Sequence, residues 1–424
     1  MAKWLTGTFK GVPLLLTLIW IAAFSAALHF FDKSVTAFLG ILSSIILVYY
    51  TNATKTVRFL LGAAVLLLII PLVAGDNRYY MEVASQVGIY VAMALGLNIV
   101  VGFAGLLDLG YVAFFAAGAY AYAIFSTSQA NEFIPGDLFP LSGEWFWVFL
   151  IVGLIVAAIF GILLGLPVLR VKGDYLAIVT LGFGEIIRII FNNLDKPVNI
   201  TNGPQGITPI PSPELFGVKM GTPFYFYFIV LFVIAFIVLA NVRFEHSRLG
   251  RAWIAVREDE LAAQSMGISL LHTKLAAFAT GASFAGVVGV IFAAKQTFID
   301  PTSFTLMESI GILVMVILGG SGSIPGVVLG AAFVTVLQVQ LLKEFSNFLH
   351  SLQQSGIINL PNQLDPSKFQ RLIFGIMLIL VALYRPNGLI PAKRKKNDID
   401  AIKDSAYAKE KLGILGKLSQ GKQS

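Results

Sequence analysis

The chain lacks cysteine altogether, and its histidines are few and isolated. The absence of cysteine excludes disulfides, thiolate metal sites and a cysteine nucleophile. No spacing suited to a metal site relates the four histidines, His29, His246, His272 and His350. No cluster of nucleophile and base is visible elsewhere, so the sequence gives no support to an enzyme.

A second absence concerns nucleotide chemistry. The chain contains no G-x-x-x-x-G-K-[ST] phosphate-binding loop, because Gly416 and Lys417 are followed by Leu418 and lack the upstream glycine. We therefore expect that this chain does not hydrolyse ATP by the usual P-loop route. We also expect it to bind no cofactor or metal of its own.

Charge is scarce as well. Charged residues make up 12% of the chain, hydrophobic residues 57%, and the mean hydropathy is +0.82. Soluble domains carry about 25% charged residues. This small number of charges cannot cover a water-facing surface of this size. Most of the surface must therefore face lipid.

What the sequence does contain is a series of long apolar runs. A bilayer core needs about 20 apolar residues of helix to cross it, so each run predicts a spanning helix. The fold class predicted is all-α, a polytopic bundle of about 10–12 spans. We place the spans at 12–31, 35–50, 59–74, 81–101, 110–126, 145–168, 174–192, 223–241, 274–296, 304–320, 326–342 and 370–384. The first run resembles a signal peptide, but its length favours an uncleaved helix.

The basic residues indicate the orientation of these spans. The net charge is +7, and groups of basic residues lie between or after apolar runs, at Lys55, Arg58, Arg170, Lys172, within 243–273 and at 393–396. The positive-inside rule places these segments and both termini in the cytoplasm, which leaves 193–222 and 343–369 outside. This distribution favours topology and anionic lipid over nucleic acid as its cause.

Two glycine clusters interrupt the helical pattern. The first break is Gly102–Gly110 and the second is Gly319–Gly326. Irregular backbone at membrane depth is tolerated only where protein or a water-filled path shields it. A weak internal repeat is one interpretation of the two breaks, although their glycine spacings differ. Close helix packing through small residues and a role in lining a path both remain open.

Four groups of residues together resemble a known family. They are Leu95–Gly102 with Gly105–Tyr111, Gly173–Arg188, Leu249–Trp253 with Arg257–Glu260 and Ala262–Ala263, and Arg385–Pro391. In this order they resemble the LivM-type permeases of the branched-chain amino acid ABC importers. The resemblance implies a larger, type II-like importer permease core at 81–392, preceded by accessory helices at 1–80. A basic cytosolic tail, 393–424, follows.

The resemblance also implies partners and a role. It implies a permease subunit in the bacterial inner membrane. The partners would be a second homologous permease, two cytosolic ATPases that use ATP, and a periplasmic substrate-binding protein. A short helix at Arg257–Met266, ended by Gly267, would be the coupling helix that docks on an ATPase. Arg257, Glu258, Asp259 and Glu260 would meet the rim of the ATPase groove, and Ala262, Ala263 and Gly267 its floor. A merely solvated cytosolic loop is the alternative.

Candidate path residues are fewer and less specific. We name Gly102, Gly105, Asp108, Tyr111, Thr180, Glu185, Gly319 and Gly322. Ionisable groups in apolar segments are costly and usually face a cavity or a partner. Glu185 and Arg188 are three residues apart on a predicted helix, so an ion pair between them is expected. Asp108 could contact a substrate ammonium or cap a half-helix, and we favour the second interpretation.

Two other transport functions fit parts of the sequence. A urea or amide ABC importer permease is related, although such permeases usually lack the accessory helices at 1–80. An ion-coupled secondary transporter would need intramembrane carboxylates or broken-helix ion sites. Asp108 and the two breaks leave that alternative open.

Overall fold

The computed structural model of the chain describes residues 12–30, 35–75, 77–134, 139–168, 171, 173–354, 372, 375–376, 379–380, 383–384 and 388–392. The predicted basic tail at 393–424 lies outside the described residues. The chain packs as two compact units, one of Met1–Tyr90, Ser212–Ala235 and Ala332–Gln370, and the other of Val91–Pro211, Phe236–Ala331 and Arg371–Ser424. The division predicted from sequence, at residues 80 and 392, stays a prediction.

The first unit begins with a helical hairpin. Helices α1 (Leu14–Phe30) and α2 (Val35–Tyr50) are antiparallel, since a backbone bridge joins Val12 to Thr51. Trp20 Nε1 donates a hydrogen bond to the Gly40 carbonyl at 3.0 Å and ties the two helices together. The unit also contains α3 (Lys55–Ala64), α4 (Ile70–Ala74), a π-helical turn (Leu337–Leu341) and α15 (Leu342–Gln354). Tyr79 donates to Gln340 at 2.8 Å and links two segments far apart in sequence.

Three helices contribute to both units. They are α5 (Arg78–Leu97), α9 (Pro223–Glu245) and α14 (Ile324–Val336). A π-helical turn, Asn98–Phe103, extends α5 up to the first break. The external segment predicted at 193–222 carries a small hairpin of β1 (Glu214–Leu215) and β2 (Val218–Lys219), in which Glu214 pairs with Lys219.

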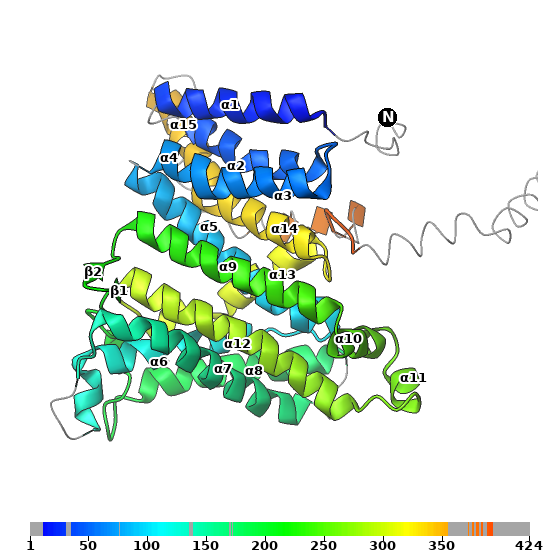
Figure 1. Cartoon of the computed structure of the whole chain (residues 1–424). Coiled ribbons are helices and arrows are strands. Elements are labelled where there is room, and N and C mark those ends of the chain that lie inside the picture. Colours follow the sequence, from blue (N-terminus) through cyan, green and yellow to red (C-terminus); the bar gives the residue numbers. More distant parts are fainter. Residues whose placement is uncertain are drawn as a thin grey trace, which may run out of the picture. The chain divides into compact units, whose positions relative to one another are not determined.

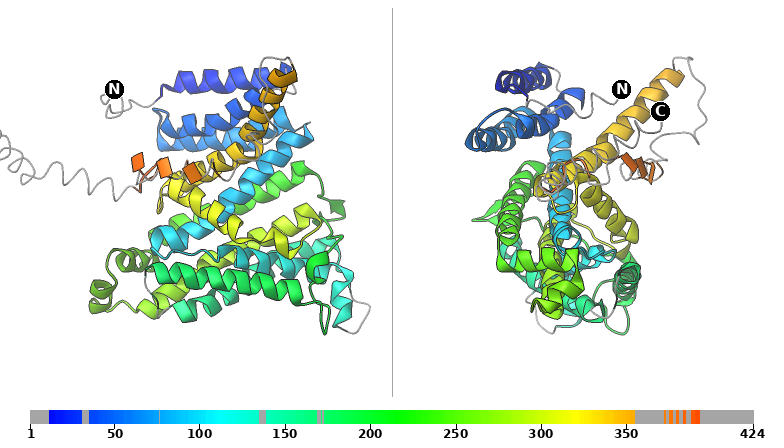
Figure 2. Two further views of the ribbon diagram at one scale, coloured as in Figure 1. Left: turned by 180° about the vertical axis from the view of Figure 1, so that it is seen from behind. Right: turned by 90° about the vertical axis from the view of Figure 1, so that its right-hand side faces the viewer.

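The second unit is built around one long helix. Helix α12 (Leu270–Gln296) runs alongside α6 (Tyr111–Ser126) and α7 (Phe146–Val168) (Figure 1). Its packing is backbone against backbone, because a Cβ added at Gly286 would overlap the Gly153 carbonyl of α7. Small residues permit this approach, which is the usual way apolar helices associate in a membrane. Helices α8 (Asp174–Asn193) and α13 (Leu306–Gly319) complete the unit, with α10 (Arg248–Glu258) and α11 (Glu260–Ser265) beyond the N-terminal end of α12 (Figure 2).

The helices match the predicted spans closely. In the described part of the chain, eight helical stretches are long and apolar enough to cross a membrane: Thr56–Ala74, Arg78–Phe103, Gly143–Pro167, Tyr175–Asn193, Pro223–Glu245, Leu270–Gln296, Pro301–Gly319 and Ile324–Leu341. Shorter apolar helices occupy Leu14–Phe30, Thr36–Tyr50 and Tyr111–Ser126. Each corresponds to one predicted run, and the remaining run, 370–384, lies mostly outside the described residues. The all-α, polytopic fold is confirmed.

Candidate coupling and translocation site

The segment between α9 and α12 forms two short helices instead of one. The predicted start of the helix Arg257–Met266 is wrong, because the backbone is extended at Asp259, with φ −157°, and the helix begins after it. Asp259 caps α11 by accepting hydrogen bonds from the amides of Leu261 and Ala262 at 2.8 and 3.0 Å. Arg257 and Glu258 therefore belong to the end of α10. The predicted stop is correct, since α11 ends just before Gly267.

The α10–α11 segment is anchored firmly to the start of α12. Trp253 of α10 is fully buried, and its Nε1 donates to the Thr273 carbonyl at 2.9 Å. Glu260 of α11 pairs with Lys274 at 2.6 Å, and the lysine side chain is only 4% exposed. A buried charge is tolerated only when it is paired, so this ion pair fixes the relative position of α11 and α12.

The outer face of α11 is apolar with an acidic edge. Leu261 is 67% exposed and Met266 83%, and Ala262, Glu258 and Asp259 are exposed beside them. Ala263 is buried against its own chain, so it is not free to form the floor of an interface. Large exposed apolar side chains on a water-facing segment are typical of a protein contact surface.

Arg257 points inward and does not lie on the exposed rim as predicted. It is half-buried, and its Nη1 donates a hydrogen bond to the carbonyl of Gly102 in the first break. Its alkyl stem lies against Gly105, where an added Cβ would be 2.6 Å from Arg257 Cγ. Gly105 also has φ +71°, a backbone region that favours glycine.

The first break is held to α8 and α12 by side chains. Asp108 is fully buried and accepts a hydrogen bond from the Gly110 amide at 2.8 Å, immediately before α6. Thr180 of α8 accepts from the Leu109 amide at 3.0 Å. Tyr111 donates to the Gly281 carbonyl at 3.3 Å. Asp108 thus organises the turn that starts α6, although its partner is the N-cap residue and not the first helical amides.

The second break is held mainly by backbone. Gly319 packs so closely against the Gly326 carbonyl that a Cβ would overlap it. The amides of Leu389 and Ile390 donate to the carbonyls of Leu318 and Gly319 at 2.8 and 3.0 Å. The two breaks meet where Asn98 Oδ1 accepts a hydrogen bond from the Gly322 amide at 2.8 Å. Gly102, Gly105 and Gly322 therefore lie together with Arg257.

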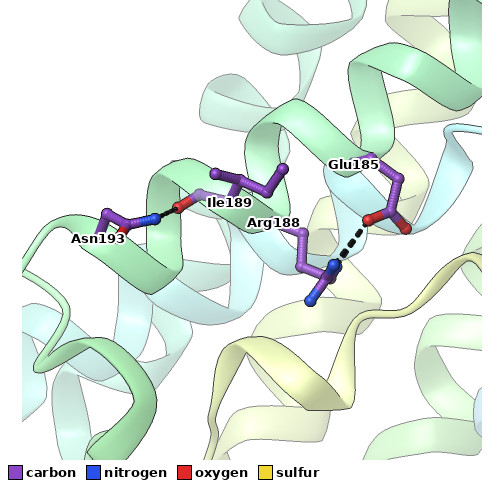
Figure 3. Close-up of polar contacts among 4 residues, drawn as sticks. All are labelled: Glu185, Arg188, Ile189 and Asn193. Atoms are coloured by element: carbon purple, nitrogen blue, oxygen red, sulfur yellow. Dashed lines mark hydrogen bonds and ion pairs between the residues drawn. The ribbon is translucent and has the colours of Figure 1, made fainter.

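Glu185 has its ionic partner within α8 itself. It forms the expected ion pair with Arg188, with Arg188 Nη2 2.8 Å from Glu185 Oε2, on the same face of α8 (Figure 3). Both side chains are about one third exposed, at 31% and 32%. Charged groups on a spanning helix avoid lipid, so this face of α8 requires a polar or protein neighbour.

Sequence reasoning missed several residues that organise the site. Asn98 lies within the Leu95–Gly102 motif but was not predicted as a site residue, although a polar amide near the end of an apolar run is a recognisable signal. Lys274 is a charged residue at the start of an apolar run, which is likewise a signal of a paired or functional side chain. Leu261 and Met266 carried none, because their exposure depends on how α11 is anchored.

A bundle of membrane-crossing helices, interrupted by two glycine breaks and carrying an anchored short helix with an exposed apolar face, defines a polytopic helical permease. The chain belongs to the family described as "Branched-chain amino acid transport system / permease component", whose model matches residues 79–382. It is a multi-pass membrane protein.

Curated relatives agree with the family. The high-affinity branched-chain amino acid transport system permease protein LivM of Escherichia coli is 36% identical over 81% of this chain and 77% of its own length. A probable LivM protein of Methanocaldococcus jannaschii is 27% identical, over 72% of this chain and 91% of its own. The high-affinity branched-chain amino acid transport system permease protein LivH of Salmonella typhimurium is 23% identical over 71% of this chain and 91% of its own length. No solved structure matches the chain.

Proposed function

We propose that this chain is a permease subunit of an ATP-driven importer for branched-chain amino acids. The observation that carries the proposal is the family match over residues 79–382, supported by the LivM relatives in Escherichia coli and Salmonella typhimurium. The chain would supply part of the translocation path, and cytosolic ATPase subunits would supply the energy. A periplasmic substrate-binding protein would select the amino acid.

The second permease is proposed to be a homologue of this chain. LivM and LivH are differently named permease proteins of branched-chain amino acid systems, and both resemble it. A homologous partner would also provide the protein neighbour that the Glu185–Arg188 face of α8 requires. We propose an inner-membrane location with both termini cytoplasmic, as the basic loops indicate.

Helix α11 is the proposed docking element for an ATPase. Its anchorage through Glu260 and Lys274 lets a force applied to α11 move α12. Its exposed Leu261 and Met266 offer apolar anchors, and Glu258 and Asp259 a polar rim, which is the usual composition of a protein interface. Glu260 and Gly267 complete the proposed contact, whereas Arg257 and Ala263 support it from inside.

The path itself is proposed to run beside the first break and α8. Gly102, Gly105, Asp108, Tyr111, Thr180 and Glu185 are its proposed lining or supporting residues, with Gly319 and Gly322 from the second break. An apolar zwitterion needs few specific contacts when a separate protein selects it. A permissive path therefore fits the proposed substrate.

Reconstitution tests the function directly. In proteoliposomes, uptake of radiolabelled leucine should require the ATPases, the binding protein and ATP together. Excess valine or isoleucine should compete for uptake, whereas competition by urea would support the related amide importers instead. Uptake by this chain alone on an ion gradient would contradict the proposal and favour a secondary transporter.

A matched pair of variants tests the docking element. Leu261→Glu and Gln264→Glu add the same charge to exposed positions of α11, but only the first removes an apolar anchor. We expect Leu261→Glu to abolish co-purification of the ATPase, because a carboxylate buried without a partner is strongly unfavourable. Gln264→Glu should retain it. Equal co-purification by both variants would contradict docking through the apolar face.

A further inference from the structure

Arg257 occupies the only place in the described site where the α10–α11 segment, the first break and the second break come together. It lies in the last turn of α10, two residues before the cap of α11. Its guanidinium donates to the Gly102 carbonyl and lies beside Gly322, where an added Cβ would be 3.1 Å from Nη1. One side chain therefore binds backbone of the first break and lies next to the second.

Asn98 completes this connection. Its Oδ1 accepts the Gly322 amide at 2.8 Å, and it is fully buried. Gly102 follows Asn98 by one helical turn, so the turn that Arg257 binds also carries the side chain that binds the second break. A movement of Arg257 that shifts this turn would therefore reach both breaks.

We propose that Arg257 is the positioning residue that transmits movement of α11 to the two breaks. The inference rests on the proposed function, since it assigns the route by which ATPase movement reaches the path. Arginine suits the task, because its guanidinium stays charged and can direct several donors at backbone carbonyls. The glycines suit it too, because a side chain at Gly105 would push the arginine away.

The distinguishing prediction is uncoupling. In the fully reconstituted transporter, Arg257→Gln should reduce substrate uptake about tenfold or more, since hydrogen bonds to charged groups have that energetic weight. ATP hydrolysis in the same vesicles should stay near the wild-type rate, because α11 and its anchors remain. Arg257→Lys keeps the charge and one donor direction, so it should restore part of the uptake.

Arg251 provides the matched control. It lies on the same helix, is exposed, and also donates Nη1 to a backbone carbonyl, that of His246 at 3.0 Å. Arg251→Gln should leave both uptake and hydrolysis unchanged. An unchanged ratio of uptake to hydrolysis in Arg257→Gln would overturn the proposal.

A second measurement serves if Arg257→Gln does not assemble. Because the chain has no cysteine, Leu107→Cys places a single thiol in the first break, at a half-buried position. Its labelling rate in the complete transporter should differ between nucleotide-free and ATP-bound states, and Arg257→Lys should shrink that difference. An equal difference in both backgrounds would overturn the role of Arg257. Nucleotide-independent uptake by the wild type would instead overturn the proposed function.

Discussion

In the first break, side chains hold the backbone: Asp108 binds the Gly110 amide, Thr180 binds the Leu109 amide, and Arg257 binds the Gly102 carbonyl. In the second, Gly319 packs directly on Gly326, and Leu389 and Ile390 bind it backbone to backbone. Side-chain hydrogen bonds exchange by rotation, whereas a backbone contact changes only if a helix moves. The first break can therefore respond to movement of these side chains, whereas the second moves only together with its helices.

Added volume in the second break should separate the helices that pack there. Gly319→Val would force α13 and α14 apart, because its side chain would overlap the Gly326 carbonyl. We expect loss of folded protein from the membrane, measured as the yield of monodisperse protein in detergent. Gly311→Val is the control, since Gly311 lies on the same helix with no neighbouring atom within 4 Å. Normal yield of Gly319→Val would show that the second break is as adaptable as the first.

Asp108 tests the main side-chain contact of the first break. Asp108→Ala leaves the buried Gly110 amide without its acceptor, which should lower the free energy of unfolding by about 1–3 kcal/mol. Asp108→Asn keeps an oxygen in the same place and should cost less. Thermal unfolding of both variants in one detergent measures the difference. If Asp108→Asn unfolds normally but stops uptake, the carboxylate charge itself acts on the substrate.

Thr180 should contribute less than Asp108. Thr180→Val keeps the shape but removes the acceptor of the Leu109 amide, for an expected loss of about 1 kcal/mol. Thr180→Ser retains the hydroxyl and serves as control. An equal loss in both variants would point to packing of the methyl group instead of the hydrogen bond.

The Glu185–Arg188 pair lies outside both breaks and should have the smallest effect on stability. Glu185→Gln removes a partly exposed ion pair, whose contribution is expected to be below about 1 kcal/mol. Uptake measured in the same variant separates stability from a path or partner role. A loss of stability as large as that of Asp108→Ala would contradict this ranking.

The sequence predicted the fold well because membrane crossing imposes one dominant constraint. Length and hydropathy located the helices, the glycine clusters located both breaks, and the i, i+3 spacing predicted the ion pair of Glu185 and Arg188. The contacts between segments could not be predicted in this way. That Arg257 turns inward and Ala263 is buried depends on the cap at Asp259, which splits a pattern that looks like one helix. The extended backbone at Asp259 alone therefore made the prediction wrong about which of these side chains face inward and which face outward.

Helix α12 has 27 residues and is about 40 Å long, so it exceeds the thickness of a bilayer core. At its beginning it carries Lys274, and just beyond its end the carbonyls of Thr297 and Ile299 accept the amides of Ile210 and Ile207. Helix α12 therefore offers a second mechanical connection beside that of Arg257. We expect a tilt imposed at the Lys274 end to displace the loop around Ile207 at the other end, so that the helix couples the two sides of the membrane.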